Sequence, residues 1–156
     1  KQTLRRAGNH ALLYQGFSLA YGCAGYGMAC LKLWRETGEA EYLHKADQVA
    51  DVLLQEVSED DSGLRWTDGN DTPVPIGLAE GSSGIALFLL YVFRATADNR
   101  YLRSACRALD HDISKGRRVQ GALGFPTDTS PDSRILYPYL SYGSAGIASV
   151  ALRVFF

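Results

Sequence analysis

The hydrophobic residues of this chain fall into two alternating kinds of segment. Residues 25–37 and 82–96 are apolar on nearly every side, which is typical of helices buried inside a larger body. Residues 39–56 and 98–113 place apolar side chains at positions i, i+3, i+4 and i+7, with polar side chains between them. This spacing predicts amphipathic helices. The sequence therefore predicts a buried helix followed by an amphipathic one, and then the same pair again.

A glycine-rich turn precedes each buried segment, and a third copy lies near the end of the chain. The three turns share the pattern Gly-x-x-Gly and run from Gly22 to Gly25, from Gly81 to Gly84 and from Gly143 to Gly146. Their first glycines are 59 and then 62 positions apart, and a Tyr-Leu pair and an alanine in the amphipathic segments keep the same register. A nearly constant period with matching positions indicates an internal repeat. We place the repeats at approximately 18–74, 75–136 and 137–156, with the third one truncated.

Helix pairs of this kind predict an all-α fold, and specifically an α/α toroid, in which an outer ring of helices encloses an inner ring. The buried segments would form the inner ring and the amphipathic segments the outer ring. Glycines at the mouths of the inner helices allow the backbone to turn tightly. Two and a half pairs cannot close a ring, and the pattern stops midway at Arg153–Phe156. We therefore expect this chain to be a fragment of a larger protein.

Composition argues against some classes of binding partner. With 156 residues, 46% of them hydrophobic, and a formal charge of −1, the chain offers no electrostatic reason to expect nucleic acid or an acidic membrane as a partner. The longest apolar run, residues 85–93, is too short to span a bilayer. Three cysteines without framework spacing indicate reduced thiols and a cytoplasmic location.

Two long connections, residues 58–80 and 114–142, lead into glycine turns, so we expect them to gather at one end of the molecule. Residues 63–69 predict a short extended piece and a turn. Trp66 and Phe125 lie in these connections and are candidates for substrate binding. Packing within small hairpins explains both aromatic residues equally well.

The repeated motifs resemble those of a known protein family. Inner helices that begin with Gly-x-x-Gly-Ile-Ala, outer helices with Tyr-Leu-x-x-Ala, and the segment 77–90 resemble the lanthionine synthetase C-like cyclases over most of residues 15–156. The resemblance implies an enzyme that adds cysteine thiols of a precursor peptide, made of leader and core, to dehydroalanine or dehydrobutyrine. The products are thioether rings.

The positions just before the glycines depart from the zinc-dependent members of that family. Those members carry Cys two places before one glycine and Cys-His immediately before another. Here the three pairs are Ala20-Tyr21, Ala79-Glu80 and Ser141-Tyr142, which cannot supply the thiolate and imidazole ligands of zinc. We therefore expect no metal and no other cofactor in this part of the protein.

Without zinc ligands, the sequence is most similar to the cyclase domain of class III lanthipeptide synthetases. In that family a phosphoserine lyase domain and a kinase-like domain precede the cyclase in one polypeptide, and these domains would be its partners. ATP and magnesium are then implied only for the kinase domain of the parent chain. The ring could be lanthionine or labionin, and the sequence does not indicate an oligomeric state.

The same positions supply the candidate catalytic residues. Glu80 is the one carboxylate among them, and it suits the transfer of the thiol proton. Tyr21 and Tyr142 suit hydrogen-bond donation to the developing enolate, since a phenol pKa near 10 is poorly matched to proton abstraction. The alternatives are a carboxylate resting against a helix N-terminus and tyrosines packed on the cavity wall. Cys23 occupies a position that holds serine in the other repeats, which the need for a small residue explains.

Two other classes of function stay open. One is a toroid that binds the precursor peptide and performs no chemistry. The other is an α/α toroid that processes carbohydrate or isoprenoid substrates. A carbohydrate enzyme needs two carboxylates facing the cavity, whereas these positions supply only Glu80. An isoprenoid enzyme needs an acidic cluster, and Asp60-Asp61 is more easily explained as the end of a loop.

Overall fold

The repeats fold into helix pairs joined by small hairpins. The structure is a computed structural model that describes residues 6–8, 10, 12–67 and 73–156. Residues 6–8 are helical, and the helices that follow are α2 (Cys23–Thr37), α3 (Ala40–Gln55), α4 (Ser82–Thr96), α5 (Asn99–Ser114) and α6 (Ser144–Phe155). The antiparallel strands β1 (Ser58–Asp60) and β2 (Gly63–Arg65) follow α3, and β3 (Arg117–Val119) and β4 (Ala122–Gly124) follow α5. The chain is therefore all-α with small hairpins in its connections.

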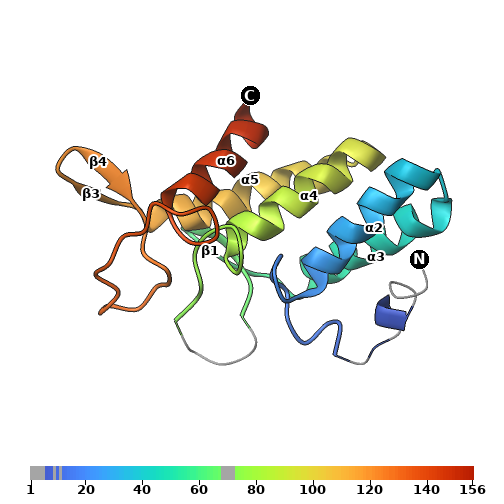
Figure 1. The fold of residues 1–156 in the computed structure, drawn as a ribbon, viewed down its shortest axis with the longest axis horizontal. Coiled ribbons are helices and arrows are strands. Elements are labelled where there is room, and N and C mark those ends of the chain that lie inside the picture. Colours follow the sequence, from blue (N-terminus) through green and yellow to red (C-terminus); the bar gives the residue numbers. More distant parts are fainter. Residues whose placement is uncertain (1–5, 9, 11, 68–72) are drawn as a thin grey trace.

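The helices lie in two layers. In Figure 1, α2, α4 and α6 lie in front, and α3 and α5 lie behind them. Helix α4 is in the middle of the front layer, where it contacts α2 on one side and α6 on the other and packs most extensively on α5. Its central position explains why nine of its fifteen residues are buried. This arrangement confirms the prediction of an α/α toroid fragment with inner and outer helices.

The predicted helix ends agree closely with the structure. The inner helices begin directly after the first glycine of each turn, so the second glycine lies in the first helical turn. Helix α4 has the predicted bounds. Gly38 ends α2 with a left-handed backbone (φ 71°), and Asp98 caps α5 by accepting a hydrogen bond from the Arg100 backbone N–H. The predicted extended piece is strand β2, while the turn predicted at residues 68–69 lies outside the described residues.

The second glycine of each turn is required by close backbone contact. A Cβ atom at this position would lie 2.0–2.2 Å from the carbonyl oxygen of a leucine six residues earlier. The pairs are Gly25 with Leu19, Gly84 with Leu78, and Gly146 with Leu140. Since a side chain there would clash with backbone rather than with a movable group, the turn can fold back on the helix only where the residue is glycine.

The inner layer is also closely packed between helices. A Cβ atom at Gly27 of α2 would lie 2.4 Å from the ring of Phe88, which is fully buried on α4. The absence of a side chain at Gly27 therefore lets α2 approach α4. In the part of the chain that the structure describes, no helix combines the length and the apolar character needed to cross a membrane.

Candidate functional site

A ladder of backbone hydrogen bonds joins the three glycine turns. The Ala20 N–H donates to the Ala79 carbonyl oxygen at 2.9 Å, and the Ala79 N–H donates to the Ser141 carbonyl oxygen at 2.9 Å. These three residues are equivalent in the repeat. The ladder therefore sets the turns side by side, and the residue after each member lies along the same edge of the inner layer.

Two of the three predicted catalytic residues are in direct contact. The Tyr142 hydroxyl donates a hydrogen bond to Oε1 of Glu80, which is 62 residues earlier in the chain. This hydrogen bond raises the pKa of Tyr142 to about 12, with smaller contributions from burial and from the nearby charge of Glu80. Tyr142 is therefore a neutral hydrogen-bond donor at physiological pH.

A pocket of about 270 Å³ lies beside Glu80, between the loop before α2, the loop before α4 and the start of α4. Tyr21 and Trp66 line it together with Glu80. The Tyr21 side chain is 83% exposed, and its hydroxyl has no hydrogen-bond partner among the described residues. The backbone N–H of Tyr21 is held by the Ser18 hydroxyl at 3.1 Å. Tyr21 is thus fixed at the backbone and open to solvent at the phenol.

The two aromatic residues predicted to bind substrate are buried. Trp66 lines the pocket but is only 6% exposed, and its indole N–H donates to the Leu53 carbonyl oxygen at 2.8 Å. Phe125 is 5% exposed and does not line the pocket. Its ring lies against Gly116, where an added Cβ atom would come within 2.9 Å. Packing explains both positions, and a substrate-binding role stays a prediction.

A buried carboxylate, Asp112, stabilises the turn that carries Glu80. The sequence did not identify this residue as part of the site. Asp112, near the end of α5, is fully buried. Its Oδ2 atom accepts hydrogen bonds from the backbone N–H groups of Gly77 at 3.0 Å and Ser83 at 2.8 Å. These two residues flank Glu80 on either side, so Asp112 fixes the turn that carries Glu80. Its Oδ1 atom lies 3.2 Å from Nδ1 of the equally buried His111.

The thiols are not arranged for metal binding or nucleophilic attack. Among the described residues, no group of three or more His, Cys, Asp and Glu side chains is placed to hold a metal ion. Cys23 and Cys30 are buried, Cys106 is partly buried, and all three are free. Burial is the main cause that raises the pKa of Cys23 to about 11. Cys23 is therefore a protonated thiol at neutral pH, which agrees with a role as a small packing residue.

Comparison with protein families gives a match. The family model described as lanthionine synthetase C-like protein matches residues 3–155, which is nearly the whole chain. No curated protein is matched by this chain. The family match covers the three glycine turns, the ladder that joins them and the pocket beside Glu80.

Proposed function

Because the chain belongs to the lanthionine synthetase C-like family, we propose that it is the cyclase part of a class III-like lanthipeptide synthetase. It adds cysteine thiols of a precursor peptide to dehydroalanine or dehydrobutyrine and forms lanthionine or labionin rings without zinc. The proposal includes the repeat boundaries at about residues 74 and 136, a cytoplasmic location, and kinase and lyase domains in the parent chain.

The donor set at the helix mouths supports a reaction without zinc in this part of the protein. The ladder residues Ala20, Ala79 and Ser141 occupy the positions where a zinc-dependent relative would place a ligand, and none offers a thiolate or an imidazole. The residues after them are Tyr21, Glu80 and Tyr142, which hold or donate protons. We therefore propose that Glu80 accepts the thiol proton and later returns it.

The first step of the proposed reaction is proton transfer. The carboxylate of Glu80 accepts the proton of the peptide thiol, and the thiolate attacks the β-carbon of the dehydro residue. A C–S bond forms as the C=C π bond breaks, and the electron pair moves onto the carbonyl oxygen as an enolate. Because protonated Glu80 is a weaker acceptor, the Tyr142 hydroxyl is released to donate to this oxygen.

The second step is protonation of the enolate. Glu80 returns the proton to the α-carbon of the enolate, which restores the carbonyl group and the carboxylate, and the Tyr142 hydroxyl can again donate to Glu80. Tyr21, with its exposed phenol, is a second donor to the enolate. For labionin, the enolate carbon would attack the β-carbon of a second dehydro residue. The C=C π bond of that residue breaks, and Glu80 would give its proton to the α-carbon of the new enolate. No proton is left over in either route.

One observation carries the proposal: Glu80 and Tyr142, 62 residues apart, form a hydrogen-bonded pair beside a pocket at the mouths of the inner helices. A carboxylate that merely stabilised a helix N-terminus would not need a phenol from another repeat. A toroid that only binds peptide also places polar groups in its cavity, so activity must separate the two functions.

The experiment uses the full enzyme with a precursor peptide that is already dehydrated, so kinase and lyase activity do not affect the result. Ring closure is followed by thiol alkylation and mass spectrometry. We expect Glu80→Gln to slow ring closure by about 10² to 10⁴-fold, the range for loss of a general acid–base group. Glu59→Gln, at an exposed carboxylate of β1, is the control and should react at the wild-type rate. Ring closure at the wild-type rate in Glu80→Gln would show that Glu80 is structural, whereas absence of ring closure in the wild type would favour a toroid that only binds the peptide.

A further inference from the structure

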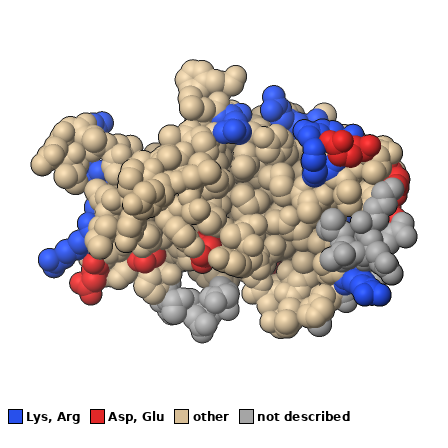
Figure 2. Space-filling model, viewed as in Figure 1, with Lys and Arg blue, Asp and Glu red and all other residues tan. Residues whose placement is uncertain are grey.

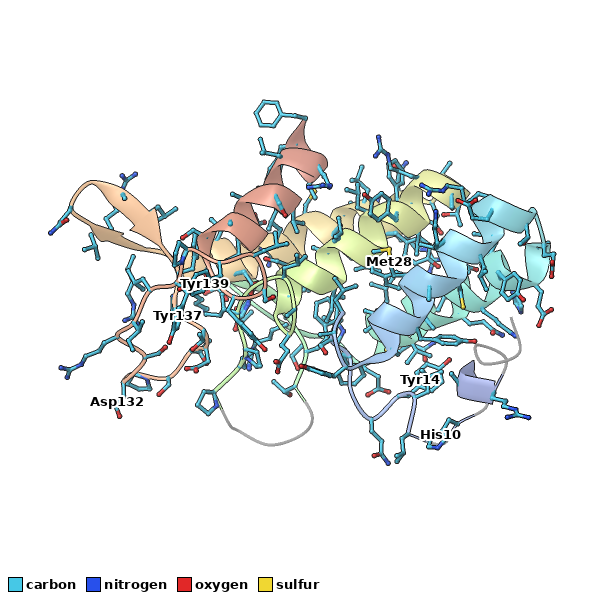
Figure 3. All side chains as sticks on the ribbon, in the orientation of Figure 1. His10, Tyr14, Met28, Asp132, Tyr137 and Tyr139 are labelled. Atoms are coloured by element: carbon cyan, nitrogen blue, oxygen red, sulfur yellow. The ribbon has the colours of Figure 1, made fainter. Side chains whose placement is uncertain are left out.

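A second pocket lies between the inner helices α2 and α4, towards their C-terminal ends. Its volume is about 460 Å³. The floor is apolar, the rim is basic, and the lining contains no residue of the outer helices α3 and α5. We call this pocket the basic groove; its floor consists of Met28, Leu31, Trp34, Tyr91 and Ala95, and its rim of Lys32, Arg35 and Arg94. Met28 lies between α2 and α4 in Figure 3.

The charge of the rim is only partly neutralised. Lys32 and Arg35 both contact Glu36, at 2.6 Å and 3.5 Å, so one carboxylate serves two cations. Arg94 makes no ion pair with any residue that the structure describes. Figure 2 shows basic side chains gathered over the C-terminal ends of the inner helices, while most of the surrounding face is neutral. The groove therefore combines an apolar floor with a net positive rim.

We propose that the basic groove binds an acidic segment of the peptide substrate, one that carries apolar side chains among its carboxylates. This inference rests on the proposed function for the identity of the peptide. Apolar side chains of the segment would fill the recessed floor, and its carboxylates would meet the guanidinium groups of Arg35 and Arg94, which can each donate two parallel hydrogen bonds.

Shape and charge favour a peptide over other anionic partners. A membrane surface is bound by apolar side chains that project outward, whereas the floor of this groove is recessed between two helices. A nucleic acid needs a continuous basic surface, whereas the rim is local and the chain has a formal charge of −1. A short peptide with a few carboxylates fits both the size and the charge of the groove.

The position of the groove predicts where the acidic residues of the substrate should lie. Ser82, at the Glu80 pocket, and Arg94, at the basic groove, are at opposite ends of α4. Ser82 and Arg94 are twelve positions apart, which corresponds to about 18 Å at a helical rise of about 1.5 Å per residue. An extended peptide covers that distance in about five or six residues. We therefore place the acidic segment about that far from the residue that reacts.

Helix stabilisation is the competing explanation for the rim, because cations are favourable near helix C-termini. Arg153 allows the two explanations to be separated. It lies in the last turn of α6, as Arg35 and Arg94 do in α2 and α4, and its guanidinium donates to the Ser149 carbonyl oxygen. It does not line the groove. Arg153→Glu therefore loses the helix effect without touching the proposed site.

Binding is measured by fluorescence anisotropy on the full chain. The probe is a labelled twelve-residue peptide that alternates glutamate with leucine or phenylalanine, compared with versions in which glutamine or lysine replaces every glutamate. We expect Arg35→Glu/Arg94→Glu to bind the acidic peptide at least about tenfold more weakly, Arg153→Glu to bind it like wild type, and the glutamine peptide to bind weakly to all. The double variant should in turn gain affinity for the lysine peptide. This gain shows that the variant is folded and that the rim charge selects the peptide.

Several results would overturn the proposal. These are equal loss of binding in Arg153→Glu, no gain for the lysine peptide, or tighter binding of anionic phospholipid vesicles or single-stranded DNA than of the acidic peptide. The assay needs no ring closure, so it stays informative if the cyclase proposal fails. If ring closure is confirmed but the acidic peptide does not bind, only the groove proposal is wrong.

Discussion

The carboxylate of Asp112 accepts a hydrogen bond from the backbone N–H of Ser83 at 2.8 Å, although the two residues lie on different helices. Ser83 is in the first turn of α4, where N–H groups have no partner within the helix. The same carboxylate oxygen accepts the N–H of Gly77. Asp112 thus joins the outer helix to both sides of the turn that carries Glu80.

Asp112→Ala should destabilise the fold. The substitution leaves two buried N–H groups without an acceptor, and we expect a loss of about 3 kcal/mol in the free energy of unfolding. Urea unfolding followed by circular dichroism measures it. Asp110→Ala is the control, because Asp110 lies on the same helix with its side chain 49% exposed, and its nearest cation is 4.0 Å away. A loss of similar size in both variants would contradict the assigned role of Asp112.

The glycines of the repeat give a second prediction. Gly84→Ala places a Cβ atom 2.1 Å from the Leu78 carbonyl oxygen, so backbone must move. We expect a loss of about 2–3 kcal/mol, in the range for overpacking of a buried position. Gly16→Ala is a matched change, because the nearest atom to its added Cβ is 3.7 Å away. Thermal unfolding of both variants checks the prediction, and equal melting temperatures would refute the close contact at Gly84.

The fold could be predicted from the sequence because the structure uses the same contact in every repeat. Each glycine turn packs on a backbone carbonyl, and each ladder residue bonds to its neighbour, so the positions of Gly84 and Ala79 recur at a nearly constant period. Helix bounds followed from apolar periodicity, since buried faces must be apolar. The pre-glycine positions also singled out Glu80 and Tyr142 as candidates, and the structure brings these two residues into contact.

Other parts of the site depend on contacts that do not recur from one repeat to the next. Asp112 occurs in one repeat only, and its counterpart in the first repeat is the buried Leu53. A polar residue on an amphipathic helix is expected to face solvent, so its burial could not be inferred without the turn that it supports. The burial of Trp66 depends likewise on a hydrogen bond to a distant carbonyl group. The basic groove requires α2 and α4 to be set side by side.

Trp66 offers a test of packing against substrate binding. Trp66→Phe removes the indole donor and leaves the Leu53 carbonyl oxygen without it, which we expect to cost about 1–2 kcal/mol of stability. Binding of the precursor peptide should change by less than about twofold, because Trp66 is only 6% exposed and offers a bound peptide little contact area. Chemical unfolding and fluorescence anisotropy measure the two effects. A weakened peptide affinity at unchanged stability would restore Trp66 as a substrate-binding residue.

The last prediction concerns the protonation of Tyr142. Its pKa in the folded protein is raised from 10.0 to about 12, chiefly because its hydroxyl donates to Glu80. For a group whose pKa is raised on folding, the stabilising contribution is complete below the unfolded pKa. It is lost as pH rises through the folded value. The stability difference between wild type and Tyr142→Phe should therefore be constant up to about pH 10 and shrink between about pH 10 and 12.

Carbon-13 labelling of the tyrosine ring lets nuclear magnetic resonance follow this titration directly, with the Tyr142 signal assigned from its absence in Tyr142→Phe. In Glu80→Gln the neutral amide cannot repel a phenolate as the carboxylate does, so the midpoint should fall towards 10. Tyr139→Phe is the control, since it removes another tyrosine near the same turn and leaves the pair intact. If Tyr142 titrates near 10 in wild type and does not respond to Glu80→Gln, the two side chains are not paired in solution. The proposed release of the Tyr142 hydroxyl, which depends on that pairing, then fails with it.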